Sequence, residues 1–150
     1  MRAVAIVDTS IFCNVLNIPH MNGEREQVMK ELESFLKAET TLLLPMATVY
    51  ETGNHIAHIK GGDRRRFAAL FVEQVQKAIV GDAPWQVMQV PTTEEIGEWL
   101  TAFPDSAMRG AGMGDLSIIK EWEKFTRKVP SYRVFIWSLD SDLKGYDHGP

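Results

Sequence analysis

Cysteine is nearly absent from the sequence, since Cys13 is the single one among 150 residues. No disulfide can therefore form within the chain, and no combination of Cys and His has the spacing of a zinc site. The sequence also has no apolar run of transmembrane length, and the five apolar residues before Asp8 are too few for the core of a signal peptide. We therefore expect a cytoplasmic protein in a reducing environment, without membrane association.

Basic residues are fewer than acidic ones, since the chain has 16 Lys and Arg and 20 Asp and Glu, which gives a net charge of −4. Most general nucleic-acid binders have a basic surface, so this balance argues against one unless several acids surround bound cations. Linkers, repeats and low-complexity tracts are missing too. With 45% hydrophobic residues, the chain is expected to form a single domain over residues 1–150.

Three short apolar runs, at 3–7, 40–44 and 134–139, have the composition of strands that are covered on both faces of a sheet. Residues 85–90 are a weaker candidate for a further strand, and residues 104–114 are expected to form a loop. Periodicity and capping signals predict helices at 11–16, 24–37, 47–60, 64–80, from Thr92 to 103 and from Asp115 to 125. This alternation predicts an α/β fold, specifically a three-layer α/β/α sandwich with a central parallel sheet.

Acidic residues fall where the predicted strands end. Asp8 directly follows the first strand and Asp140 follows the last one, while Glu51 lies about two turns into the helix after the second strand. Asp115 opens a helix after a glycine-rich loop. The carboxyl ends of parallel strands meet at one edge of a sheet, so these four carboxylates are expected to converge there. Because such a cluster repels itself without cations, it favours bound Mg²⁺ or Mn²⁺. Taken alone, Asp8 is equally well explained as the N-cap of the following helix.

The motifs around these acids resemble those of the PIN-domain family, and the size of the chain resembles that of the VapC-type ribonuclease toxins. The resemblance covers essentially the whole chain, and its motifs occur in the family's order. They are Val7-Asp8-Thr9-Ser10, Tyr50-Glu51, Gly114-Asp115-Leu116-Ser117-Ile118-Ile119 and Ser138-Leu139-Asp140-Ser141-Asp142-Leu143. Two features depart from the family pattern: Leu143 stands where an aromatic residue is common, and the loop before Asp115 is rich in glycine and methionine. Both leave the subfamily and the substrate open.

The resemblance implies an endoribonuclease that hydrolyses RNA phosphodiester bonds with Mg²⁺ or Mn²⁺ and is often inhibited by a small antitoxin protein. It implies a catalytic quartet of Asp8, Glu51, Asp115 and Asp140. Asp8, Asp115 and Asp140 would hold the metal together with Asp142. Hydroxyl groups near the metal and the substrate would come from Thr9, Ser10 and Ser138. We also expect a homodimer.

Basic side chains that can contact RNA fall in two places. Arg109 lies in the glycine-rich loop that leads to Asp115, which makes it the better candidate for substrate binding. Arg64, Arg65 and Arg66 follow a Gly-Gly pair at the start of a predicted helix. They can hold an RNA backbone or simply be solvated, although three cations at a helix N-terminus oppose the helix dipole, which favours a bound anion.

Two histidines share the predicted helix with Glu51. His55 and His58 lie four and seven residues after it, so they lie on the same helix face. They can extend a metal site, contact a phosphate group or be ordinary surface histidines.

Other functions fit the first motif less well. An aspartyl-phosphate phosphatase requires a second acid two residues after Asp8, where Ser10 stands. A phosphoacceptor receiver requires paired acids just before the phosphoacceptor strand and a lysine after a late strand, but Asp8 has no acidic neighbour and Lys144 is a poor match. A metal-dependent adhesion site of the Asp-x-Ser-x-Ser kind is interrupted by Phe12. The strongest competing prediction is a catalytically inactive PIN-like module that binds RNA or a protein. The complete set of four acids favours the nuclease.

Overall fold

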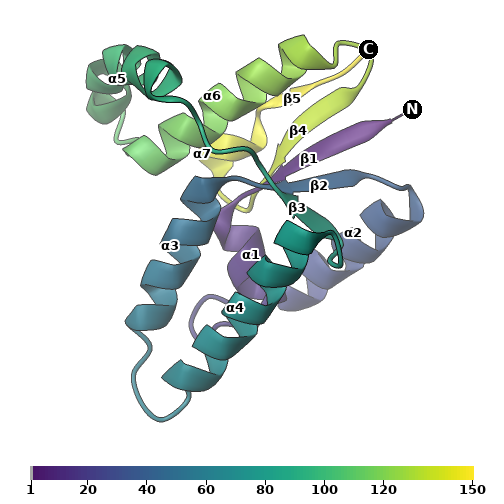
Figure 1. The fold of residues 1–150 in the computed structure, drawn as a ribbon, viewed down its shortest axis with the longest axis vertical. Coiled ribbons are helices and arrows are strands. Elements are labelled where there is room, and N and C mark those ends of the chain that lie inside the picture. The colour runs from purple at the N-terminus through teal and green to yellow at the C-terminus, as the bar shows by residue number, and fades with distance from the viewer. Residues whose placement is uncertain (1) are drawn as a thin grey trace.

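The computed structural model describes residues 2–150, which form an α/β structure around one five-stranded sheet (Figure 1). The strands are β1 (Ala3–Val7), β2 (Thr41–Leu44), β3 (Trp85–Val87), β4 (Arg133–Trp137) and β5 (Asp147–His148), arranged in the order β3-β2-β1-β4-β5. The helices are α1 (Thr9–Val15), α2 (Arg25–Lys37), α3 (Met46–Ala57), α4 (Arg64–Val80), α5 (Thr93–Met108), α6 (Met113–Lys128) and α7 (Ser141–Lys144).

The central strand of the sheet is β1, which pairs in parallel with β2 on one side and with β4 on the other. β3 extends the sheet in parallel beyond β2, whereas β5 pairs antiparallel with β4. The α/β prediction is confirmed, and the sheet is mixed, because β5 adds an antiparallel strand to the four parallel ones. This strand has only two residues and is held by an ion pair of 2.9 Å between Arg133 and Asp147. Two residues are too few to give a pattern in the sequence.

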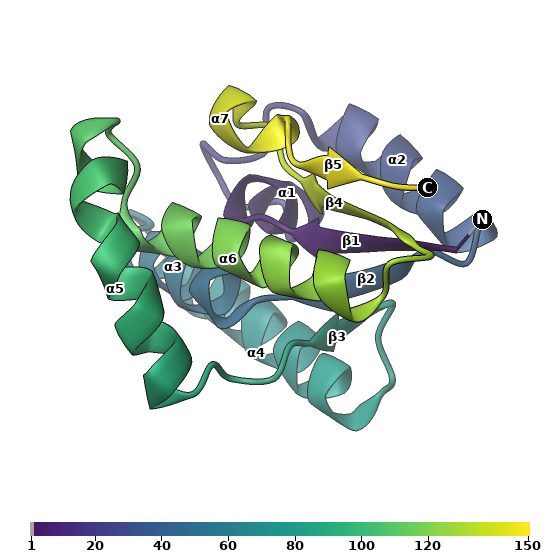
Figure 2. The same ribbon diagram turned by 90° about the horizontal axis from the view of Figure 1, so that it is seen from above.

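Helices pack on both faces of the sheet, which explains the uninterrupted apolar runs of its inner strands. Val7 of β1 belongs to a core on one face that includes Phe12 of α1 and Val28 of α2. Ile6, its neighbour in the strand, points to the other face and packs with Ile118 of α6. Figure 1 and Figure 2 accordingly show α6 on the opposite side of the sheet from α1 and α2. None of the helices within residues 2–150 has the length and apolar character needed to cross a membrane.

The predicted loop at 104–114 is mostly helical. α5 continues through Pro104 to Met108, and α6 begins at Met113, so the connection is short and Asp115 lies in the first turn of α6. Pro104 is exposed, and Leu100, whose carbonyl loses its helical partner, is 51% exposed. Because water can satisfy that carbonyl, the proline interrupts one hydrogen bond without ending the helix.

Candidate functional site

Asp8 lies at the carboxyl end of β1, where its backbone N–H donates to the Trp137 carbonyl of β4 (3.0 Å). It occupies the N-cap position of α1, but its side chain makes no capping hydrogen bond. Asp8 is 5% exposed, and its carboxylate accepts hydrogen bonds from Ser138 Oγ (2.7 Å) and Ser10 Oγ (2.9 Å). Helix capping therefore accounts for the backbone position of Asp8 and not for its side chain.

The two serine hydroxyls are fixed in orientation by the backbone of the loop after β4. Ser138 Oγ accepts from Asp140 N (2.9 Å), and Ser10 Oγ accepts from Leu139 N (3.0 Å), so each hydroxyl directs its own proton to Asp8. Both donate to Oδ2 of Asp8, and among residues 2–150 no donor contacts Oδ1. Oδ1 is therefore the oxygen of this carboxylate that is available to a ligand.

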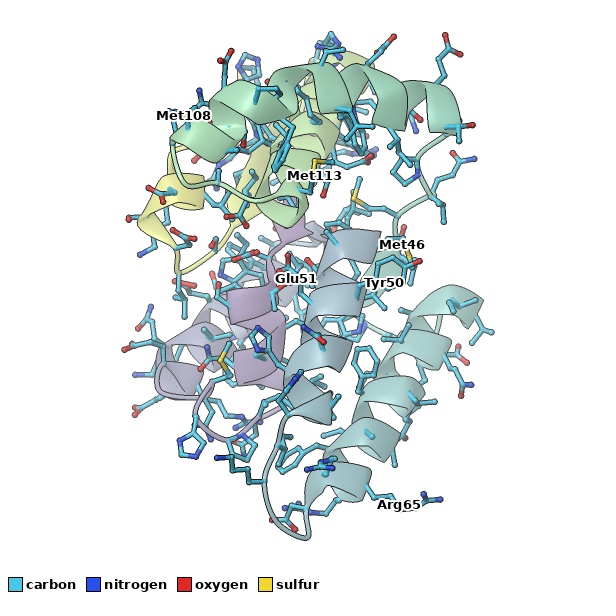
Figure 3. The ribbon with its side chains drawn as sticks, turned by 90° about the vertical axis from the view of Figure 1, so that its left-hand side faces the viewer. Met46, Tyr50, Glu51, Arg65, Met108 and Met113 are labelled. Atoms are coloured by element: carbon cyan, nitrogen blue, oxygen red, sulfur yellow. The ribbon has the colours of Figure 1, made fainter. Side chains whose placement is uncertain are left out.

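Glu51 reaches the same edge of the sheet from the second turn of α3. Thr9 Oγ1 donates to its Oε2 (2.9 Å), and its Oε1 lies against the backbone of Gly114 in the first turn of α6. A β-carbon at position 114 would collide with this oxygen. Figure 3 shows Glu51 on α3 below Met113, the first residue of α6. Glycine at 114 is thus what lets α6 approach the carboxylate.

Asp115 lies next to Gly114 in α6 and interacts electrostatically with the other acids. Its pKa is raised from 3.8 to about 6, mainly by burial and then by the negative charges of Asp8, Glu51, Asp140 and Asp142. The structure therefore brings together all five acids identified in the sequence, from four separate segments of the chain.

Asp140 and Asp142 are also joined by a capping hydrogen bond at the start of α7. Asp140 is the N-cap of α7, and its Oδ1 accepts from the backbone N–H of Asp142 (2.9 Å). Asp142 itself is exposed in the first turn of that helix. Capping by Asp140 fixes the loop whose backbone orients both serines, so this acid also holds the surroundings of Asp8 in place.

The three arginines predicted to bind substrate lie in two different places. Arg109 ends α5 and lines a cavity of about 350 Å³ together with Asp115 and Asp142. Arg64, by contrast, donates from Nε to the Ile59 carbonyl (2.7 Å) beyond the end of α3. Figure 3 shows Arg65 at the opposite end of the molecule from Met108, well away from Glu51. The acidic site therefore gains Arg109 and not Arg64 or Arg65.

The oxygen donors at this edge of the sheet are carboxylates and hydroxyls, which suit Mg²⁺ and Mn²⁺ better than softer metals. Within residues 2–150, no three or more His, Cys, Asp or Glu side chains are arranged as a group that could hold a metal ion. The fit to a divalent cation therefore rests on the chemistry of the donors and on the surroundings of Asp115, whose pKa is raised first by burial and then by the nearby negative charges.

The roles of two residues of this region are not identified by the sequence patterns. Gly114 belongs to the third motif, directly before Asp115, but no pattern indicates that it lies against the side chain of Glu51. Thr48 is completely buried in α3, and its Oγ1 donates to the Val7 carbonyl (2.7 Å). This bond connects the helix that carries Glu51 to the strand that ends at Asp8.

Replacing Thr48 by valine is expected to lower the free energy of unfolding by about 1–2 kcal/mol, because it removes the hydrogen bond to the buried Val7 carbonyl. Urea denaturation measures the change. Thr101→Val is the control, since its exposed hydroxyl also bonds a backbone carbonyl (2.6 Å). If the two variants have the same free energy of unfolding, the hydrogen bond of Thr48 to β1 does not contribute to the stability of the fold.

Replacing Asp115 by asparagine is expected to stabilise the metal-free protein at pH 7.5. The folded carboxyl has the higher pKa, so between about pH 4 and pH 6 the folded state binds more protons than the unfolded state. Stability therefore falls as the pH rises through this range, and above it the ionised group destabilises the fold by a constant amount. After allowance for solvent screening, the variant should gain about 1 kcal/mol at pH 7.5.

Denaturation in chelator at pH 7.5 and at pH 3.5 measures this effect. The stability difference should be present at the higher pH and vanish at the lower one, where both states are protonated. Asp105→Asn, at an exposed position of α5, is the control. An Asp115→Asn variant that is less stable than the wild type at pH 7.5 would contradict the raised pKa of Asp115.

Comparison of the chain with protein-family models, with curated proteins and with solved structures finds no match in any of the three.

Proposed function

We propose that the protein is a metal-dependent endoribonuclease of the PIN type, similar to the VapC toxins, which hydrolyses RNA phosphodiester bonds. The observation that carries this proposal is the convergence of Asp8, Glu51, Asp115 and Asp140, from four chain segments, at the carboxyl end of the central strands. Within residues 2–150 none of these four carboxylates forms an ion pair, and a cluster of negative charge without a cation is costly, which supports a role in holding cations.

Mg²⁺ or Mn²⁺ is the proposed cofactor, and Asp8, Asp115, Asp140 and Asp142 are its proposed ligands. A divalent cation in such a site supplies positive charge to a phosphoryl group and lowers the pKa of an attacking water. The oxygens of these side chains are hard ligands of the kind that both ions prefer.

The chain's own residues divide the remaining tasks. Ser10 and Ser138 orient Asp8 so that Oδ1 stays available, and Thr9 holds the Glu51 carboxylate through Oε2. Arg109 lies where it can bind an RNA phosphate beside Asp115, because both line the same cavity. A phosphodiester hydrolase needs its carboxylates and its phosphate-binding side chains to be held in fixed positions in this way.

The remaining parts of the proposal are a three-layer, PIN-like arrangement of the helices about the sheet, a cytoplasmic location and a protein partner. Packing of helices on both faces supports the first part. Val72, Ile79 and Val80 line one face of α4 and are exposed, which supports a further protein surface, either for a second copy of the chain or for a small antitoxin.

The test is incubation of the purified protein with labelled single-stranded and structured RNAs in Mg²⁺, in Mn²⁺ and in chelator. We expect cleavage in one or both metals and none in chelator. A folded protein that binds the RNAs but leaves them intact in both metals would instead be the catalytically inactive PIN-like module. A protein that neither binds nor cleaves RNA would contradict the proposal entirely.

A further inference from the structure

A second cavity lies at the end of α3 that is farther from the sheet. Its volume is about 470 Å³, and its polar lining consists of His20, His55, His58 and Lys60. Apolar side chains, among them Ile18 and Ile59, form the rest of its wall. The described residues that line this histidine cavity include no Asp or Glu, although the protein as a whole is acidic.

Three histidines line this cavity, and the backbone at each end of it determines where their imidazoles lie. α3 ends at Ala57 and not at the predicted position 60, so His58 is the C-cap and Lys60 lies in the following turn. The ring of His58 uses Nδ1 to donate to the Asn54 carbonyl (2.7 Å), which leaves Nε2 as the nitrogen available to a ligand. His20 has a φ of 67°, a left-handed conformation that is uncommon for residues other than glycine.

Basic residues continue from the cavity into the turn between α3 and α4. Residues 60–66 hold Lys60, Arg64, Arg65 and Arg66, and Asp63 is the one acid in this stretch. Asp63 is paired with Arg66 (3.4 Å), and Arg64 is held against the end of α3 by its bond to the Ile59 carbonyl. The turn and the cavity together form a local concentration of positive and protonatable groups, which attracts anions.

The histidine cavity also lies along α3 from the acidic site. His55 and His58 follow Glu51 by one and two helical turns, which corresponds to roughly 6 and 10 Å along the helix axis. A single RNA strand bound at Glu51 can therefore continue along α3 to these imidazoles.

We propose that the histidine cavity and the α3–α4 turn bind phosphate groups of single-stranded RNA outside the cleavage position. This inference rests on the proposed nuclease function and gives Arg64 and Arg65 a role away from the acidic site. Lys60 binds the phosphates, together with imidazoles in their cationic form, in which Nε2 of His58 is a donor, and the apolar wall accommodates the uncharged face of a nucleotide.

The test is equilibrium binding of a labelled 12-nucleotide single-stranded RNA in chelator, where no cleavage occurs. The double variant His58→Gln with Lys60→Gln should bind about tenfold more weakly than the wild type, and the dependence of affinity on salt should fall by about 0.7 for each phosphate that the variant no longer neutralises. The control is Lys30→Gln with Lys37→Gln, which removes two exposed charges of α2. Both substituted positions of the cavity are exposed, and thermal unfolding verifies that the variant is folded.

Cleavage of a dinucleotide RNA in Mn²⁺ separates this inference from the nuclease proposal. We expect the cavity variant to cleave this short substrate like the wild type, because its single phosphate is the one that is cleaved and none remains for the cavity. If the cavity variant binds RNA more weakly but no form of the protein cleaves RNA, the result would support RNA binding by the histidine cavity and contradict the proposed nuclease activity. If the cavity variant binds RNA as tightly as the Lys30 and Lys37 control, the histidine cavity is not an RNA-binding site, whether or not the protein cleaves RNA.

Discussion

Replacing Asp8 by asparagine is expected to lower metal-dependent RNA cleavage by about a thousandfold, which corresponds to roughly 4 kcal/mol of transition-state stabilisation. The amide oxygen can take the place of Oδ2 and accept the hydrogen bonds of Ser10 and Ser138. The amide nitrogen then stands where Oδ1 was, so the available oxygen and its negative charge are both removed. The side-chain shape is unchanged, and the variant should fold.

The comparison that isolates the role of Asp8 is with Asp105→Asn, which removes one negative charge from an exposed position on α5. That control should cleave RNA at the wild-type rate. Cleavage rates are measured at a Mn²⁺ concentration that saturates the wild type, and thermal unfolding verifies that both variants are folded. A folded Asp8→Asn protein that cleaves RNA as fast as the control would exclude Asp8 from the catalytic site.

Replacing Gly114 by alanine is expected to reduce cleavage by about ten- to a hundredfold while leaving the fold intact. The new β-carbon collides with Oε1 of Glu51, and because this atom ends a flexible side chain, the carboxylate moves and the backbone stays. A displacement of about 1 Å in a catalytic group is enough for such a reduction. Alanine is the better helix former by about 1 kcal/mol, so the free energy of unfolding should change little.

Gly97 offers the matched control, because it also lies inside a helix and a β-carbon there meets no atom within 4 Å. Gly97→Ala should retain full cleavage. Adding Glu51→Asp to the Gly114→Ala variant shortens the colliding side chain and should restore part of the activity. If Gly114→Ala cleaves RNA like Gly97→Ala, the position of the Glu51 carboxylate does not limit the reaction.

The acids could be predicted to gather because their positions follow from local patterns. Asp8 and Asp140 each come after an apolar run that is short enough and rich enough in branched residues to be a buried strand. Glu51 follows the second strand by a countable number of helical turns. Parallel pairing of β1 with β2 and β4 then brings these ends together, which is a consequence of topology and needs no knowledge of side-chain contacts.

The contacts inside the site could not be predicted, because they join distant parts of the chain. Ser10 and Ser138 are separated by 128 positions, and their shared hydrogen bonds to Asp8 depend on how the loop after β4 returns to β1. The approach of Gly114 to Glu51 depends in the same way on the docking of α6. Such details are set by tertiary packing, which no local pattern encodes.

The errors in the predicted elements have a similar origin. Pro104 indicates a helix end by local rules, yet an exposed position tolerates the missing hydrogen bond. β5 is too short to have a periodicity, and its pairing depends on the contact between Arg133 and Asp147. The histidine cavity is visible in the sequence only as two histidines on one helix, because His20 reaches it from another segment.

Titration of the metal-free protein with Mn²⁺ in a calorimeter tests most directly whether the acids form a divalent cation site. Asp105→Asn and Asp8→Asn are titrated alongside the wild type. We expect saturable binding by the wild type and by Asp105→Asn, a rise of their unfolding temperatures with Mn²⁺, and neither effect in Asp8→Asn. A folded wild-type protein that binds no Mn²⁺, or that binds it as well without the Asp8 carboxylate, would contradict the proposed site.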